Sequence, residues 1–201
     1  MSYYRNTTLN SDKNLRAYII GLAIGDGNLS NPNGRATCLR ITCDDKYPQL
    51  KNHIIESLAS LLPDNKVGVV KNPRNCSNVY VYSNQLENLL GWKAKGGSKF
   101  VQNVSTPNWI KTKPEYIRPY LRGLIETDGS IYKDRGYPMV NFTSIIEGLA
   151  MEVKDLIELL GFGPKLYKLK PRIGYNKYPF YHIRLSKDVQ KFLDLVKPDK
   201  S

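Results

Sequence analysis

Several features that would place this chain in a particular class are missing from it. There are only three cysteines, Cys38, Cys43 and Cys76, with neither a CxxC pair nor a Cys/His metal spacing. A disulfide scaffold and a zinc site are therefore not indicated. No apolar run reaches about 18 residues, the length that could span a membrane, and the polar residues 1–10 contain no apolar signal core. These absences favour a soluble protein of a reducing compartment.

Positive charge, by contrast, is abundant and spread along the chain. Lys and Arg number 30 against 18 Asp and Glu, which gives a formal net charge of +12. Because no basic block or tail is present, the charge favours a basic face on a folded body, and such a face attracts polyanions such as nucleic acid. The chain has 201 residues, 41% of them hydrophobic, which is enough for one large or two small domains with a buried core.

Two stretches of the chain are nearly the same. Residues 19–27 read IIGLAIGDG, and residues 121–129 read LRGLIETDG. Each is an apolar run that contains glycine and ends in an acidic residue followed by glycine. Asp26 and Asp128 occupy equivalent places 102 positions apart, which indicates a duplication of about half the chain. A duplicated carboxylate suggests one site that contains two acids.

The small residues in these runs predict close packing of two helices. Glycine inside a helix costs about 1 kcal/mol relative to alanine, so its presence requires a compensating contact. Gly21 and Gly25 are four residues apart, and the second run repeats this spacing with Gly123 and Thr127. Packing along these stripes would bring the two aspartates together at two negative helix ends, where a divalent cation would balance them. Phosphodiester hydrolysis is the reaction class that uses such a pair.

The same order of elements follows each run. After the first we expect a strand at 36–42, a helix at 48–62, a hairpin with strands at 66–71 and 78–83, and a short helix at 84–90. After the second we expect a strand at 139–143, a helix at 146–160, a hairpin with strands at 164–171 and 179–186, and a last helix at 188–196. Alternation of period two predicts the strands, and apolar residues at helical spacing predict the helices.

Together, the two runs and this repeated order resemble the LAGLIDADG homing endonucleases, in their single-chain form with two motifs. The resemblance covers nearly the whole chain, from about residue 15 to 196. The second run matches the name-giving consensus at Leu121, Gly123, Leu124, Ile125, Asp128 and Gly129. The first run has Ile24 at the first acidic position of the consensus but keeps Gly21, Leu22, Asp26 and Gly27.

This resemblance implies an α+β fold, a duplicated αββαββα arrangement whose two antiparallel sheets form a DNA-binding saddle. It divides the chain into an N-terminal half at 1–95, a linker at 96–113 and a C-terminal half at 114–201. The implied activity is that of a site-specific double-strand DNA endonuclease, which hydrolyses a phosphodiester on each strand and leaves 3′ overhangs. Mg²⁺ would be the cofactor, with Mn²⁺ as a substitute, held by Asp26 and Asp128 together with Gly25 and Thr127.

The accessory residues near the attacking water depart from the family. The family places Gln or Lys just after the second strand of each half, where this sequence has Cys43 and Ser144. The charged residues that could take the accessory role instead are Asp44, Lys46, Lys133 and Lys187. Of these we predict Lys187 as a catalytic residue beside the two aspartates. The linker lysines, Lys99 among them, are predicted to lie beside the phosphate backbone.

The strands also indicate a DNA-facing surface. On a sheet with one face on DNA, polar or basic residues alternate with apolar residues that pack on helices, as Arg40 and Thr42 alternate with Leu39 and Ile41. Arg and Lys can pair with guanine edges, and Asn and Gln with adenine. The predicted DNA contacts are Asn28, Ser30, Asn33, Arg35, Arg40, Thr42, Lys71, Arg74, Tyr80, Tyr82, Ser130, Tyr132, Lys133, Arg135, Asn141, Thr143, Lys168, Lys170, Arg172, Tyr175, His182 and Arg184.

The expected partner is double-stranded DNA of roughly 20 base pairs, bound by a monomer that needs neither a protein partner nor a membrane. The alternative is an intron RNA maturase, an RNA-binding splicing cofactor with reduced or no nuclease activity; retention of both acids favours cleavage. A DNA-binding regulator would bring an added helix-turn-helix domain, for which we expect no spare length. Without Cys or Ser at position 1 or a terminal His-Asn pair, we expect a free-standing, intron-encoded enzyme in an organelle matrix or a prokaryotic or phage-infected cytoplasm.

Overall fold

A computed structural model describes residues 8–171 and 177–200, and these form two halves with the same order of elements. The first half contains α1 (Lys13–Gly25), β1 (Gly27–Ser30), β2 (Cys38–Asp44), α2 (Pro48–Leu61), β3 (Gly68–Asn72), β4 (Cys76–Tyr82) and α3 (Leu86–Leu90). The second contains the 3-10 helix η1 (Asn108–Thr112), α4 (Pro114–Thr127), β5 (Gly129–Asp134), β6 (Tyr137–Ser144), α5 (Glu147–Leu159), β7 (Lys165–Leu169), β8 (Phe180–Leu185) and α6 (Val189–Val196). The predicted duplication and α+β class are confirmed.

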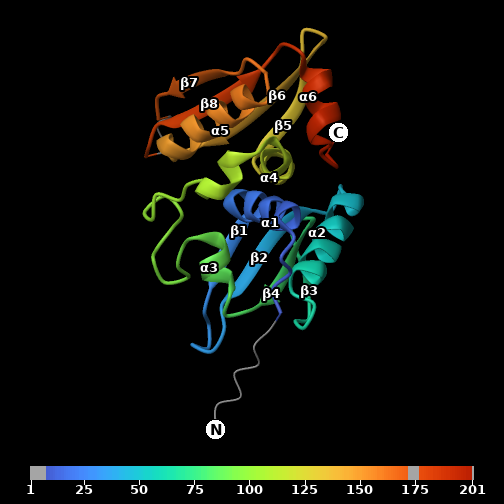
Figure 1. Ribbon diagram of the computed structural model, residues 1–201, viewed down its shortest axis with the longest axis vertical. Coiled ribbons are helices and arrows are strands. Elements are labelled where there is room, and N and C mark those ends of the chain that lie inside the picture. The colour runs from blue at the N-terminus through green and yellow to red at the C-terminus, as the bar shows by residue number, and fades with distance from the viewer. Residues whose placement is uncertain (1–7, 172–176, 201) are drawn as a thin grey trace.

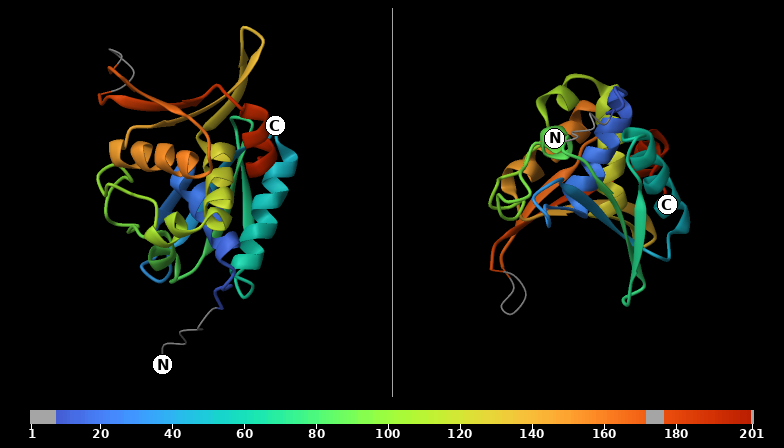
Figure 2. Two further views of the ribbon diagram at one scale, coloured as in Figure 1. Left: turned by 45° about the horizontal axis from the view of Figure 1, so that its top comes forward. Right: turned by 90° about the horizontal axis from the view of Figure 1, so that it is seen from below.

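Each half folds its four strands into one antiparallel sheet. The strand orders are β1-β2-β4-β3 and β5-β6-β8-β7, so the two sheets are topologically equivalent. Seen from below, the sheets splay apart like the sides of an arch, with the β3–β4 hairpin at one foot and the β7–β8 strands at the other (Figure 2). The helices lie on the outer, convex side of the arch. The saddle predicted from the resemblance is therefore present.

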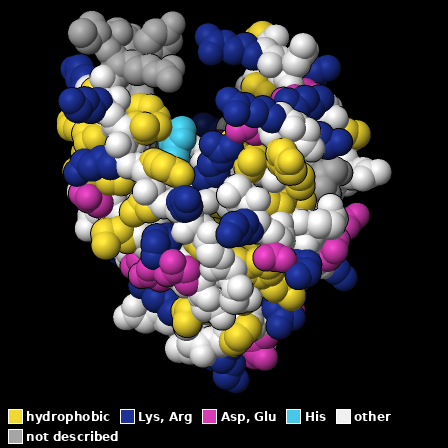
Figure 3. Space-filling view, turned by 90° about the horizontal axis from the view of Figure 1, so that it is seen from above, with side chains coloured by type: hydrophobic (Ala, Val, Ile, Leu, Met, Phe, Trp, Pro, Cys, Tyr) yellow, Lys and Arg dark blue, Asp and Glu magenta, His cyan; other side chains and the backbone are white. Residues whose placement is uncertain are grey.

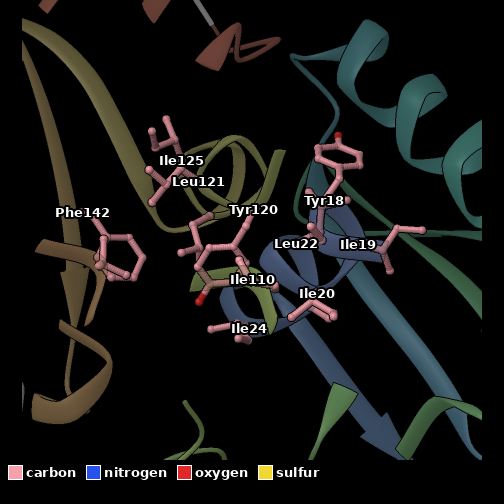
Figure 4. Close-up of a cluster of buried hydrophobic side chains, with 14 of the residues drawn as sticks. Tyr18, Ile19, Ile20, Leu22, Ile24, Ile110, Tyr120, Leu121, Ile125 and Phe142 are labelled. Carbon is pink, nitrogen blue, oxygen red and sulfur yellow. The ribbon is translucent and has the colours of Figure 1, made fainter. Parts of the chain in front are cut away.

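Helices α1 and α4 lie side by side between the two sheets and join the halves (Figure 1). A Cβ atom added at Gly21 would overlap the carbonyl oxygen of Tyr120, and one at Gly123 would overlap that of Tyr18. Only glycine permits this approach of the two backbones, which confirms the packing predicted from the small-residue stripes. Buried side chains from both helices, such as Leu22 and Leu121, surround the contact (Figure 4).

The faces of both sheets follow the predicted alternation. In the first sheet Leu39 and Ile41 are fully buried under the helices, whereas Arg40 between them is exposed. In the second sheet Phe142 and Ile183 are buried, and they occupy paired positions on β6 and β8. The concave faces are therefore free of core packing and present mainly polar side chains.

One strand has the opposite phase from the one predicted. Lys168 on β7 was expected on the concave face, but its ammonium lies 3.5 Å from Glu147 of α5 and over the ring of the buried Tyr181. Leu166, on the same side of the strand, packs against the core. The concave face of β7 instead carries Tyr167, which pairs with His182 of β8. Lys168 is thus turned away from the concave face that was predicted to contact DNA.

Residues 91–107 connect the halves and lead into η1. Several of the connector's lysines are engaged within the protein, since Lys93 pairs with Glu87 and Lys111 of η1 pairs with Glu152 of α5. The three cysteines are free thiols, as expected. Within the described residues, no helix has both the length and the apolar character needed to cross a membrane.

Candidate active site

The carboxyl ends of α1 and α4 place Asp26 and Asp128 beside one another. Each aspartate is the residue that follows the last helical position, Gly25 in α1 and Thr127 in α4. These two end residues touch, because a Cβ atom added at Gly25 would overlap the Thr127 hydroxyl. Thr127 in turn is fixed by hydrogen bonds from its hydroxyl to the carbonyl oxygens of Gly123 (2.8 Å) and Leu124 (3.1 Å). The geometry confirms that the two motifs converge.

Both carboxylates reach solvent, but neither is in an environment that favours its charge. Partial burial raises the pKa of Asp26 above its ordinary value, although the nearby Lys200 and Lys99 oppose this rise. Partial burial and then the charge of Asp26 raise the pKa of Asp128 to about 6. The charge of Asp26 therefore acts on Asp128, and the negative ends of the two helix dipoles add to the repulsion between the acids.

Lys99 of the connector supplies one positive charge to this region. Its ammonium donates to the carbonyl oxygens of Ala23 (3.3 Å), Ile24 (2.5 Å) and Gly25 at the end of α1. The last carbonyls of a helix lack α-helical partners, and although the Ala23 carbonyl also accepts from the Asp26 amide, the lysine helps to satisfy the α1 terminus. Burial lowers the pKa of Lys99, while Asp128 and then Asp26 raise it.

Lys200 plays the equivalent part at the other helix. Its ammonium donates to the carbonyl oxygen of Thr127 at 2.8 Å and lies 3.5 Å from that of Gly129, at the end of α4. Burial lowers its pKa, and the largest opposing influence is Asp26, followed by Asp128. The two lysines therefore repeat the pseudo-symmetry of the two aspartates.

The lysines and aspartates are paired across the halves. A pocket of about 260 Å³ contains Asp26 and Lys200, and a second pocket of about 350 Å³ contains Asp128 and Lys99. Each lysine thus satisfies the end of one motif helix and faces the carboxylate at the end of the other. Each pocket also contains the end of a neighbouring strand, β2 beside Asp26 and β6 beside Asp128.

The donor set fits a hard divalent cation. Neither Asp26 nor Asp128 has a hydrogen bond or an ion pair within 4.0 Å from its carboxylate to any residue in the ranges 8–171 and 177–200. Mg²⁺ binds proteins through one or two carboxylates and keeps several waters, so this pair of free, exposed oxygen ligands suits it. The carbonyl oxygens of Gly25 and Thr127 accept hydrogen bonds from the two lysines, and each retains a second lone pair.

The residues at the predicted accessory places do line the pockets. Cys43 lies with Asp26, where burial and then Asp26 raise the pKa of the thiol to about 11. Ser144 lies with Asp128, and its hydroxyl accepts a hydrogen bond from the Ile146 amide at 3.0 Å. A protonated thiol and a hydroxyl that bonds the turn before α5 are neither bases nor charges, so they do not replace the Gln or Lys of the family.

The structure gives the four charged candidates different positions. Asp44 and Lys46 border the Asp26 pocket and form an exposed ion pair of 2.9 Å. Lys133 lies on the same side of β5 as Ile131, which packs against the core. Lys187 is exposed in the turn between β8 and α6, and it is not among the groups that influence the pKa of either aspartate. The structure therefore brings Lys99 and Lys200, not Lys187, to the carboxylates.

One signal in the sequence relates these two lysines to each other, although it does not indicate what they contact. Lys99 follows Asp26 by 73 positions and Lys200 follows Asp128 by 72, so they are equivalent residues of the duplication. Both lysines lie outside the repeated strands and helices, in the segments after α3 and α6. There the two lysines occupy non-helical stretches of dissimilar sequence.

The predicted DNA contacts that the structure describes are all exposed or half-buried. In the first sheet Asn28, Arg40 and Tyr80 form a row across paired strands, and Ser130, Asn141 and Arg184 form the equivalent row in the second. Some are held by neighbours, as Arg184 is by Asp134 at 2.5 Å. The residues at exposed turns or strand ends are Asn33, Arg35, Lys71, Arg74, Arg135 and Lys170. Arg172 and Tyr175 lie outside the described residues.

Basic side chains occur on both sides of the notch between the two lobes (Figure 3). An open hollow of about 740 Å³ leads from Asp26 past Thr42 to Lys71 and Arg74 at the tip of the β3–β4 hairpin. A polyanion lying in the arch would thus pass from a basic rim to the pair of acids at its centre.

Comparison with known proteins agrees with this architecture. Residues 115–197 match the family described as LAGLIDADG-like domain. A DNA polymerase of Thermococcus sp. (strain GE8) is 26% identical over 151 residues, or 74% of this chain and 8% of that protein, and a DNA polymerase of Thermococcus hydrothermalis is 28% identical over 155 residues, or 74% and 9%. The chain therefore spans less than a tenth of the length of these curated relatives.

Two solved structures share the fold. The structure of I-DmoI in complex with DNA and Mn has a TM-score of 0.67 and 19% identity, covering 92% of this chain and 96% of that chain; I-DmoI is described as a homing endonuclease. The N-terminal LAGLIDADG domain of DUF199/WhiA has a TM-score of 0.59 and 11% identity, covering 95% of this chain and 86% of that chain. Further structures of I-DmoI contain Mg or Ca together with DNA.

Proposed function

We propose that this chain, whose residues 115–197 match the LAGLIDADG-like domain family and whose fold is shared with the homing endonuclease I-DmoI, is a site-specific DNA endonuclease. It would hydrolyse one phosphodiester in each strand of a duplex of roughly 20 base pairs bound as a monomer. The two cuts would lie across the minor groove and leave 3′ overhangs.

One observation carries this proposal: two equivalent carboxylates without partners among the described residues, each faced by a lysine from across the pseudo-twofold axis. A purely structural pair of buried charges would be satisfied by hydrogen bonds or ion pairs. Here the repulsion between the acids persists, and the lysines are engaged with helix carbonyls. Such an arrangement costs stability in the free protein, and a bound cation and phosphate would relieve that cost.

Asp26 and Asp128 would hold the metal, Mg²⁺ or Mn²⁺. When bound, the metal supplies an activated water and neutralises charge on the phosphoryl oxygens. The lysines add fixed positive charge in each pocket, and because their ammonium groups are tied to the helix ends, they need little reorganisation as negative charge develops. The basic concave faces of the two sheets would orient the duplex by contacts to phosphates and base edges.

The decisive experiment selects cleaved sites from a randomised DNA library with and without Mg²⁺. We expect one enriched site whose cleavage requires the metal. Asp26→Asn and Asp128→Asn should then lose cleavage of that site but bind it as tightly as the wild-type chain does. Cleavage by either variant at the wild-type rate would refute the two-acid mechanism. Binding to a structured intron RNA with no DNA cleavage would support the maturase alternative.

A further inference from the structure

A buried polar cluster lies on the side of α4 that faces the first half. Glu126, whose side chain is fully buried, accepts hydrogen bonds from the Tyr18 hydroxyl (2.6 Å), from Nε of Arg122 (2.9 Å) and from the Asp199 amide (2.7 Å). Burial and the carboxylate of Glu126 raise the pKa of Tyr18, so that the hydroxyl remains a donor. All the bonds to Glu126 come from different parts of the chain, α1, α4 and the segment after α6.

Asp199 extends the cluster from that segment to the first half. Its Oδ2 atom lies 2.9 Å from Nη2 of Arg122 and 2.7 Å from Nδ1 of His53 on α2. The His53 ring stacks on Tyr18 with a centroid distance of 5.0 Å. Residues 197–200 are thereby fixed at the junction of α2, α4 and α6, where the C-terminal end is drawn (Figures 1 and 2).

The residue after Asp199 is Lys200, whose ammonium enters the Asp26 pocket. A lysine side chain has high rotamer freedom, and the segment from which it projects has no regular secondary structure. The position of the ammonium therefore depends on what holds the backbone at residue 199. We propose that Asp199, held by Glu126 and Arg122, is the positioning residue that keeps Lys200 in the Asp26 pocket. The inference rests on the proposed nuclease function, since it makes Asp199 responsible for the position of Lys200 beside Asp26.

The first half has no such anchor. The positions equivalent to Arg122 and Glu126 in the first motif are Ile20 and Ile24, both buried and apolar. Lys99 is held differently, by a folded connector in which the Gln102 side chain bonds the carbonyl oxygens of Lys93 (2.9 Å) and Gly97 (3.0 Å). Loss of the Asp199 anchor should therefore impair only the pocket that Lys200 serves.

The test is the rate of cleavage of each strand, measured on DNA labelled separately on the two strands. Lys200→Met should slow cleavage of one strand more than cleavage of the other. The strand that is slowed more is the one whose cleavage depends on Lys200. Asp199→Ala should slow that same strand by about 10- to 100-fold, the range expected from a small misplacement of a charged group, and nicked DNA should accumulate. Binding of the site and cleavage of the other strand should stay within about twofold, a difference below 0.5 kcal/mol. Asp199→Asn, which keeps an acceptor for Arg122, should retain more activity than Asp199→Ala.

Asp194→Ala is the matched control, because Asp194 is an exposed acid on α6 whose side chain accepts a hydrogen bond from Gln190 one turn away. It should leave both strands unaffected. A double-mutant cycle separates positioning from general destabilisation: if Asp199 acts through Lys200, adding Asp199→Ala to Lys200→Met changes the rate no further. Additive effects, or equal slowing of both strands, would overturn the inference.

Hydrogen exchange on the metal-free protein gives a readout that does not require cleavage. The Asp199 amide donates to the buried Glu126, so it should exchange slowly in the wild-type chain and at least tenfold faster in Asp199→Ala. Unchanged protection would also overturn the inference. If the wild-type chain cuts no DNA, the proposed function fails instead, and this exchange experiment still reports on the anchor.

Discussion

Removing the charge of Asp128 should make the metal-free protein more stable while it removes activity. The pKa of this carboxyl is raised from 3.8 to about 6 by burial and by Asp26. The full pKa difference would correspond to about 3 kcal/mol at neutral pH, but the side chain is exposed, and solvent screening reduces this to roughly 1 kcal/mol. Asp128→Asn should therefore raise the melting temperature by about 2–4 °C in a chain of this size.

The size of this stabilisation depends on pH. Because the folded-state pKa lies above the ordinary value, the ionised carboxylate destabilises the folded state at pH 7, and this cost disappears as pH falls through about 6 to below 4, where both states are protonated. Thermal unfolding in EDTA at pH 7.5 and pH 4 checks this. The two proteins should differ at pH 7.5 and converge at pH 4.

Bound metal should make the wild-type chain more stable than Asp128→Asn, the reverse of their order in EDTA. A ligand at 100 times its dissociation constant stabilises a protein by about 2.7 kcal/mol, so saturating Mg²⁺ should raise the melting temperature of the wild-type chain and not that of Asp128→Asn. Asp155→Asn, a change of the same charge at an exposed site on α5, is the control. Its melting temperature should match that of the wild-type chain both in EDTA and in Mg²⁺. A variant less stable than wild type in EDTA at pH 7.5 would refute the reasoning.

Three further predictions concern packing, metal and DNA. Gly21→Ala should destabilise the fold by about 1–3 kcal/mol in urea denaturation, because its methyl group meets the α4 backbone, whereas Gly148→Ala in α5, with open space around its Cβ, should be neutral or stabilising by about 0.5 kcal/mol. The affinity for Mg²⁺, measured by calorimetry, should weaken as pH falls below about 6, because protons compete for Asp128. An affinity that does not change between pH 7.5 and pH 5 would contradict this. Arg184→Ala should weaken binding of the selected site by about 1–3 kcal/mol if it reads a base edge, while Lys168→Ala, which faces α5, should bind normally in the same titration.

The sequence was sufficient for the fold because its signals are local and repeated. Helix α2 begins at Pro48 and α5 ends just before Gly161, which has a φ of 88°, and both boundaries follow from residues that favour helix starts and stops. The alternation in β2 and β4 placed the core correctly. The glycines of the motifs gave the α1–α4 contact, and with it the convergence of the two aspartates.

The parts of the site that could not be predicted depend on contacts between distant segments. Lys99 lies 73 positions from Asp26, and nothing near it in the sequence indicates that it meets a helix end. The spacing Lys-x-Lys-x-Arg at 168–172 suggested a basic face, but the single apolar residue Leu166 determines which side of β7 turns inward. The helix termini did predict that positive charge must be present, and the structure supplies two lysines there.

The exchange of lysines across the axis has a consequence for how such a chain can be altered. A half taken from another protein of this architecture, together with the segment that follows its last helix, would bring its own aspartate to one pocket and its own lysine to the opposite pocket. A chimaera would thus mix old and new residues in both pockets at once, and neither strand would be cut by machinery from one parent alone. Retargeting by exchange of halves therefore requires compatible helix ends as well as a new DNA-facing sheet.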